Sequence, residues 1–410
     1  MSFKPPTARH PETDLLDLAY FFFLLTAVAI GWVLGRGSSR KKPDFSEQEQ
    51  SLARSYAQGL NYLLSEHHDD TIEKFIDSLE VSPVTFDTHL ALGNLLRRRG
   101  EYDQAIRVHQ NLLARPSLSR QSQHKAQFEL ACDYIAAGWL DRAERLLQEL
   151  VETSQELRAT SLEHLIEVYR DEREWAKAIH AVNLLHGRRF KRLSADWAPI
   201  QAHFCCELAE EAIASKDYLS ARKHLDAALG YDRSSVRASL LWARLEYLLG
   251  KKRDAIKVLQ RIPKQSPDYI PEILELLITC YVELDDGAGL DGYLESLLKE
   301  YPSNSVLIAL TRRIQEQDSE AAAAAFMGKQ LALRPSLRGL GRFLDLYIGT
   351  AQGRSRENLS LLKTLIDQLI ASRPHYRCSN CGFSGNQLHW LCPSCKHWDS
   401  VRSVKGIEGE

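Results

Sequence analysis

Small and apolar residues recur along most of this chain with a spacing of about one helix pair. When residues 85–118 are aligned with residues 123–156, small residues fall on small residues and leucine falls on leucine, at an offset of 38. The same small-residue position is occupied further along by Ala178, Ala221 and Ala255. The matched pairs in the first alignment are Leu92 and Leu130, Gly93 and Ala131, Gly100 and Gly138, Ala105 and Ala143, and Leu112 and Leu150.

This period is typical of tetratricopeptide repeats, which are helix–turn–helix units of about 34 residues. Small residues mark the close crossing of two helices, and larger apolar residues fill the space between them. We expect eight units that start near residues 51, 85, 123, 158, 201, 235, 270 and 304, followed by a last helix pair that reaches about Ser372. In the degenerate seventh and eighth units, Leu290 and residues 321–325 take the alanine position. The predicted fold is all-α: a superhelix of about nine helix pairs over residues 51–372, with a joint at the break from Gly187 to Pro199.

A continuous apolar stretch precedes the repeats. Residues 15–34 read LLDLAYFFFLLTAVAIGWVL, with Asp17 as the only charge, and twenty helical residues span about 30 Å, the thickness of a bilayer's hydrocarbon core. A cleaved signal peptide is the alternative, but acidic residues crowd the start and no small-residue cleavage motif ends it. The basic residues that follow, Arg36, Arg40, Lys41 and Lys42, favour a cytoplasmic body. We therefore predict an outer tail at 1–14, a single transmembrane helix at 15–35 in contact with membrane lipid, and a basic linker at 36–50.

Four cysteines near the C-terminus form two C-x2-C pairs separated by ten residues. Each pair can direct two thiolates at one cation, so the array predicts a tetrahedral site for one iron or zinc ion within a module at residues 374–410. Gly382 follows the first pair, where a left-handed residue is expected, but Lys396 follows the second, so we expect this feature on one side only. Disulfides are the alternative, and a cytoplasmic location argues against them. The predicted ligands are Cys378, Cys381, Cys392 and Cys395.

A module of about 35 residues cannot build a sufficient core alone, so the metal should supply much of its folding free energy. Its large aromatic residues also need a surface to cover them. We expect Phe383, Trp390 and Trp398 to dock on the last helix pair.

Composition and motifs favour a binding function over catalysis. The net charge is −2 with 26% charged residues, which gives no sign of a nucleic-acid partner. The sequence shows no nucleophile–base pair, Gly-rich phosphate loop or H-E-x-x-H helix, so no catalytic residues are predicted and the protein is not expected to be an enzyme. Repeat superhelices bind polypeptides in a concave groove. In the second unit the groove positions are expected to be Asn94, Arg97 and Arg98; the alternative for these residues is a solvated helix end.

In this order of segments the chain resembles the lipopolysaccharide assembly protein B family (LapB, also called YciM) of Gram-negative bacteria. The resemblance covers nearly the whole chain, and its most specific stretches are residues 56–64 (YAQGLNYLL), 92–110 (LGNLLRRRGEYDQAIRVHQ) and 376–398 (YRCSNCGFSGNQLHWLCPSCKHW). Its metal-binding cysteines map onto the four named above. The first fourteen residues are a longer lead than this family usually has, and many surface positions differ.

The resemblance implies a non-enzymatic, single-pass adaptor of the inner membrane that regulates lipopolysaccharide biosynthesis. Its partners would be the deacetylase LpxC, whose degradation by the membrane protease FtsH it would promote, and an opposing PbgA/YejM-type lipopolysaccharide sensor. Two alternatives remain open. Four thiolates also suit a rubredoxin-like electron carrier, and a repeat array also suits a general peptide-binding scaffold for envelope proteins.

Overall fold

The computed structural model describes residues 25–30, 32, 85–116, 118–186, 197–407 and 409–410. The chain divides into two compact units, residues 1–80 and 81–410. In the first unit residues 25–30 are helical, with exposed apolar side chains at Leu25, Val28 and Ile30. Among the described residues, no helix is long and apolar enough to cross a membrane.

Several predictions concern residues outside this description. Most of the predicted membrane segment at 15–35 lies there, as do the tail at 1–14, the linker at 36–50, the first repeat from residue 51 and most of the joint at 187–199. These stay predictions.

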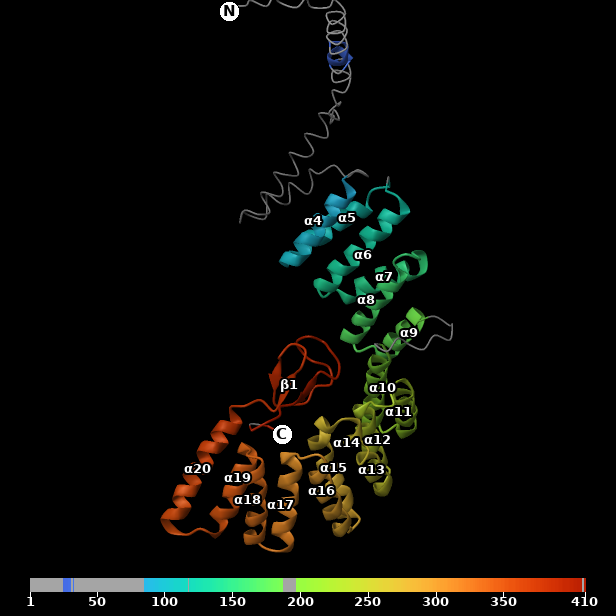
Figure 1. Cartoon of the computed structure of the whole chain (residues 1–410). Coiled ribbons are helices and arrows are strands. Elements are labelled where there is room, and N and C mark those ends of the chain that lie inside the picture. Colours follow the sequence, from blue (N-terminus) through green and yellow to red (C-terminus); the bar gives the residue numbers. More distant parts are fainter. Residues whose placement is uncertain (1–24, 31, 33–84, 117, 187–196, 408) are drawn as a thin grey trace, which may run out of the picture. The chain divides into compact units, whose positions relative to one another are not determined.

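The second unit consists of helix pairs that follow one another along the chain, each packed beside the next (Figure 1). Between α13 and α15 lie the short helix α14 (Ile262–Gln265) and the 3-10 helix η1 (Pro267–Tyr269). Within the described residues the pairs are α4 (Phe86–Arg99) with α5 (Tyr102–Leu113), α6 (Arg120–Ala136) with α7 (Leu140–Thr153), α8 (Arg158–Asp171) with α9 (Trp175–His186), α10 (Trp197–Ala214) with α11 (Tyr218–Tyr231), α12 (Val236–Leu248) with α13 (Lys252–Leu259), α15 (Ile270–Glu283) with α16 (Gly287–Glu300), α17 (Asn304–Gln317) with α18 (Glu320–Leu333), and α19 (Leu337–Thr350) with α20 (Gly353–Ala371).

The observed helix starts follow the predicted period closely. The starts expected at 85, 158, 235, 270 and 304 lie within one residue of a helix start, whereas those expected at 123 and 201 are three and four residues late. At α6 the reason is the cap: Ser119 accepts a hydrogen bond from the backbone N–H of Ser122, and this begins the helix early. The small-residue spacing locates helix crossings, which are less variable than helix ends.

The small-residue positions are where the helices of the array meet. Every residue predicted for the alanine position is completely buried from α5 to α16, including the degenerate Leu290. In the six pairs from α4 with α5 to α15 with α16, the turn within the pair also contains one residue with a left-handed backbone, which is glycine in some pairs and a charged residue in others. These turn residues are Gly100, Arg173, Gly138, Lys216, Gly250 and Asp285.

The C-terminal module adds a small sheet to the otherwise helical chain. Its strands are β1 (Tyr376–Cys378), β2 (Ser384–Gly385) and β3 (Val401–Ser403), in the order β2-β1-β3 with both pairings antiparallel. Tyr376 on the central strand pairs with Gly385 on one side and Ser403 on the other. The predicted all-α fold is therefore correct for the repeats, and the module is a separate three-stranded element.

Candidate metal centre

The four predicted cysteines converge on one point. All four sulfur atoms lie within 4.8 Å of one another, and the distances from Cys378 Sγ to Cys395 Sγ and from Cys381 Sγ to Cys392 Sγ are both 3.7 Å. A tetrahedron with metal–sulfur bonds of about 2.3 Å has edges of about 3.8 Å. The donor set therefore fits a four-thiolate metal site, and iron and zinc accept this geometry equally well.

Two similar turns present these sulfurs. The N–H of Gly382 donates to the carbonyl of Cys378 at 3.0 Å, and the N–H of Lys396 donates to the carbonyl of Cys392 at the same distance. Gly382 has φ 79° and Lys396 has φ 57°, so both turns close with a left-handed residue. The prediction that this feature occurs on one side only was wrong, because a lysine here adopts the strained conformation that glycine adopts freely.

The surroundings of the sulfurs favour negative charge at two of the four. A hydrogen bond from the Asn380 amide is the main reason that the pKa of Cys395 falls to about 5. Burial acts to raise the pKa of Cys378, yet the Ser400 hydroxyl and the backbone N–H of Cys381 hold it below its usual value. For Cys392, burial dominates and raises the pKa to about 11. Four adjacent thiolates therefore need a cation to stay deprotonated together.

The prediction that Phe383, Trp390 and Trp398 dock on the last helix pair was wrong. The ring of Trp398 stacks on His203 of α10 with 4.7 Å between centroids, and Trp390 stacks on Tyr269 of η1 at 5.2 Å. Phe383 stays within the module, against the cluster formed by Cys378, Cys392 and Val401. The tryptophans thus contact the middle of the array, where α10 and η1 offer aromatic partners and α12 offers a guanidinium. Figure 1 shows the strands of the module beside this part of the array.

A buried arginine lies between the two tryptophans. The guanidinium of Arg237 on α12 is 5.8 Å from the ring centroids of both Trp390 and Trp398 and forms ion pairs with Glu207 and Glu210 at 2.9 and 3.1 Å. Only 3% of its side chain is exposed. Sequence reasoning missed this residue, although an arginine inside the apolar stretch VRASLLWARL is an unusual signal.

Burial lowers the pKa of His203 to about 3, and the charge of Arg237 acts in the same direction. The His203 ring is therefore neutral at physiological pH, which suits a stack against Trp398. Protonation of His203 would place a second positive charge beside Arg237 in this aromatic contact.

Ionic contacts join the end of the module to η1. Asp268 lies 3.0 Å from the Arg402 guanidinium and 2.5 Å from Lys405 Nζ. Burial acts to raise the pKa of Asp268, but hydrogen bonds from Lys405 and Arg402 prevail and hold this pKa below its ordinary value. This attachment is therefore fully charged at neutral pH and is lost only in acid.

The last residues reach further along the array. The Glu410 carboxylate accepts hydrogen bonds from the Ser303 hydroxyl at 2.7 Å and from the Ser305 N–H at 3.1 Å, at the start of α17. A carboxylate at a helix N-terminus is favoured by the unpaired N–H groups there. The Leu337 N–H, at the start of α19, donates to the carbonyl of Ile407 at 2.8 Å.

Docking of the module leaves a cleft of about 610 Å³ between its second cysteine turn and helices α6, α8 and α10. Its walls combine apolar side chains with charged ones at the edge. Representative lining residues are Ile135, Ile166, Ile200, Phe204, Arg170 and Lys396.

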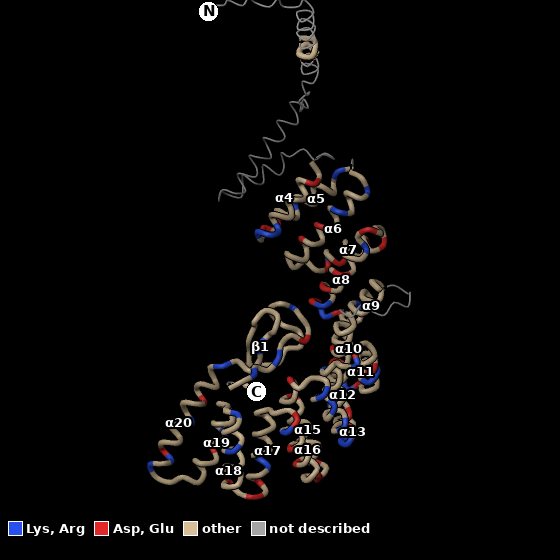
Figure 2. The backbone as a smooth tube through the Cα atoms, viewed as in Figure 1, with Lys and Arg blue, Asp and Glu red and all other residues tan. Residues whose placement is uncertain are grey.

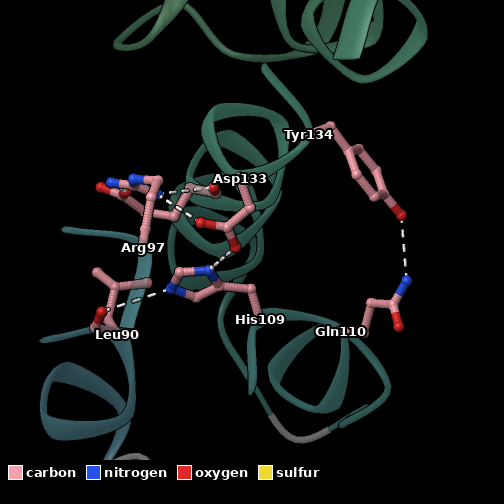
Figure 3. Close-up of polar contacts among 7 residues, drawn as sticks. Leu90, Arg97, His109, Gln110, Asp133 and Tyr134 are labelled. Carbon is pink, nitrogen blue, oxygen red and sulfur yellow. Dashed lines mark hydrogen bonds and ion pairs between the residues drawn. The ribbon is translucent and has the colours of Figure 1, made fainter. Parts of the chain in front are cut away.

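The three predicted groove residues do not form one open surface. Arg97 lies 2.7 Å from Glu129 and 2.8 Å from Asp133, both on α6, so its charge is already paired within the array (Figure 3). Asn94 is half-buried, and its Oδ1 is buried without a hydrogen-bond partner among the described residues. Arg98 is exposed. Partner binding by these residues stays a prediction, and Arg98 alone has the predicted accessibility.

Sequence reasoning also missed the buried network behind Arg97. Asp133 accepts from Arg97 through one oxygen and lies 2.5 Å from His109 Nδ1 through the other (Figure 3). Both Asp133 and His109 are fully buried. Gly93 makes room for this arrangement, since a Cβ there would lie within 3.0 Å of three ring atoms of His109. Three helices, α4, α5 and α6, are thereby joined by one polar contact.

These features define a class: a tetratricopeptide-repeat protein with a rubredoxin-type four-cysteine module docked against its repeats. Residues 376–403 match a family model described as a rubredoxin metal binding domain, and residues 88–122 and 212–283 match tetratricopeptide-repeat models. Lipopolysaccharide assembly protein B of Escherichia coli K12 is 34% identical over 391 residues, which cover 95% of this chain and 98% of that protein. Lipopolysaccharide assembly protein B of Haemophilus influenzae is 34% identical over 397 residues, with the same coverage. The chain belongs to the lipopolysaccharide assembly protein B family, as its resemblance to that family predicted.

Proposed function

We propose that this protein is a non-enzymatic adaptor of the inner membrane that restrains lipopolysaccharide synthesis by bringing the deacetylase LpxC to the protease FtsH. A PbgA/YejM-type sensor would oppose it. The observation that carries the proposal is the similarity to lipopolysaccharide assembly protein B along 95% of the chain, including the metal module.

The architecture supports a binding role. Stacked helix pairs form extended surfaces that hold polypeptides, and the cleft of about 610 Å³ beside the metal module offers apolar and charged contacts together. Figure 2 shows that basic and acidic residues are both scattered along the repeats. This mixed distribution favours protein partners over nucleic acid.

We further propose that residues 15–35 cross the membrane once, with residues 1–14 on the periplasmic side. The anchor would raise the local concentration of the repeats near other membrane proteins, so modest affinity for each partner would suffice. A version of the protein that begins near Phe45 should fold yet fail to support LpxC degradation at ordinary expression levels. Full activity of that version at native levels would show that the anchor is dispensable.

The adaptor role is tested by following LpxC after protein synthesis is blocked, in cells with and without this protein. LpxC should persist in the deletion strain and disappear rapidly once the intact protein is restored. An LpxC half-life that does not change on deletion would refute the adaptor role.

An electron carrier is the second candidate, and one observation favours it. Cys381 is exposed and Cys395 is half-buried, so two of the four ligands approach the surface, where a redox partner could reach them. The visible spectrum of protein purified without oxygen separates iron from zinc. Full restoration of LpxC turnover by zinc-loaded protein would exclude electron transfer, because zinc has no redox chemistry.

A further inference from the structure

The last helix of the array has an apolar face that no described element covers. The second helix of the preceding pair, α18, packs against both α17 and α19, whereas α20 packs extensively against α19 alone (Figure 1). Of the nineteen residues of α20, Ile366 is the buried one. Terminal repeats normally present a polar outer face, since no neighbouring repeat covers it. Here α20 departs from that rule.

Four leucines form this outer face. They are exposed by 45–63% and recur with the spacing of one side of a helix. With Asn358, three of them follow the 4-3-4 spacing of a helix–helix seam, at positions 358, 362, 365 and 369. We name the group Leu361, Leu362, Leu365 and Leu369 the α20 outer face.

Exposed positive charge lies at the N-terminal end of this face. Helix α20 itself carries Arg354, Arg356 and Lys363 against Glu357 and Asp367. Arg354 and Arg356 are exposed at the first turn of α20, which is blue in Figure 2, and neither forms an ion pair with another described residue. Lys363, in contrast, pairs with Asp345 and Asp367. The helix dipole adds further positive potential at this end.

We propose that the α20 outer face, together with Arg354 and Arg356, docks an amphipathic helix of a partner protein whose apolar seam is flanked by Asp and Glu. This helix takes the position that the next repeat would occupy. A second copy of this chain fits less well, because α20 carries only Glu357 and Asp367 as acidic residues, and Asp367 already pairs with Lys363. A membrane surface fits less well, since α20 contains no Trp, Tyr or Phe of the kind that anchors interfacial helices. The proposal does not depend on the adaptor function.

The test uses the intact protein in nanodiscs of neutral lipid and two synthetic helical peptides. Both peptides carry leucine at 3-4 spacing; one has Glu at the flanking positions and the other has Lys there. We expect the Glu peptide to bind at least tenfold more tightly than the Lys peptide, as measured by fluorescence anisotropy. Equal binding of the two, or binding of neither, would overturn the proposal.

Substitutions on α20 test whether the Glu peptide binds at the α20 outer face. The double change Leu362→Gln with Leu365→Gln should lower the affinity for the Glu peptide at least tenfold. The double change Arg354→Glu with Arg356→Glu should remove the preference for the Glu peptide over the Lys peptide. The matched control is Leu219→Gln with Leu248→Gln, which changes two exposed leucines elsewhere and should leave binding unchanged. Circular dichroism checks folding. If the first pair of changes unfolds the protein, Leu361→Gln with Leu369→Gln replaces it.

Two further results would overturn the proposal in favour of another occupant. If sedimentation shows an oligomer of the intact protein that the Leu362→Gln, Leu365→Gln variant loses, the face binds a second copy. If nanodiscs with anionic lipid displace the Glu peptide, the face binds the membrane. Unchanged sedimentation and unchanged peptide affinity in anionic nanodiscs support the helix partner.

Discussion

Replacing Gly93 by alanine tests a close contact between the helices α4 and α5. A Cβ at this position would lie within 3.0 Å of three atoms of the His109 ring. The ring has little freedom to move, because its Nδ1 lies 2.5 Å from Asp133 and its Nε2 lies 3.4 Å from the carbonyl of Leu90. The helices α4 and α5 would have to separate, or the buried polar contact would have to break.

Two effects determine the expected change in the free energy of unfolding. Alanine is favoured over glycine in a helix by about 1 kcal/mol, and overpacking of a well-packed core costs about 1–3 kcal/mol. Gly292→Ala provides the control, since Gly292 lies in α16 and a Cβ there meets no atom within 4 Å. The two variants should therefore differ by about 1–3 kcal/mol, with Gly292→Ala the more stable.

Native-state hydrogen exchange measures the local free energy of opening at each amide. It therefore suits an array whose repeats open separately. Amides of α4 to α6 should exchange about tenfold faster for each 1.4 kcal/mol lost in Gly93→Ala. Slower exchange in Gly93→Ala, as in the control, would show that His109 does not pack over Gly93.

Four other predictions concern the metal module and the groove. Cys395→Ser should release the metal and unfold the module, because metal binding supplies folding free energy there; full metal occupancy of the variant would contradict this. Trp398→Ala should cost about 3–5 kcal/mol and expose the module to proteolysis, whereas metal content should be kept; uncut protein would contradict it. The contribution of Asp268 to module attachment should be constant at neutral pH and fall as the pH drops through its lowered pKa, so a protection of module amides, relative to their intrinsic exchange rate, that stays constant from pH 7 to pH 3 would contradict it. Arg97→Ala should destabilise α4 to α6, because one oxygen of the buried Asp133 carboxylate loses its partner while the other keeps His109, whereas Arg98→Ala should leave exchange unchanged; equal effects would argue against the ion pairs described.

The repeats were predictable because their signal is periodic. A small residue at most crossings and a turn after each first helix recur along the array, so errors in one unit do not affect the next. The two late helix starts show the limit of this approach, since a cap such as Ser119 is a local feature outside the period.

The cysteine site was predictable for a different reason. Four ligands close in sequence determine their own geometry, whereas the position of the module on the repeats depends on contacts such as Tyr269 with Trp390, 121 residues apart in the sequence. Aromatic partners on α10 and η1 give no periodic signal. The expectation of docking on the last helix pair followed chain order, and side-chain complementarity determined the result.

Because the metal module docks in the middle of the array, the stabilities of distant repeats depend on one another. In a simple repeat array each unit contacts its neighbours only, so loosening one end does not affect the other. Here the module and the residues after it contact α8 through Asp171, α10 through His203, η1 through Asp268 and the start of α17 through Ser303. Repeats that do not touch each other are thereby connected through one metal-dependent element. Since anything that stabilises the folded module also favours these contacts, metal-binding free energy contributes to the stability of repeats far from the cysteines.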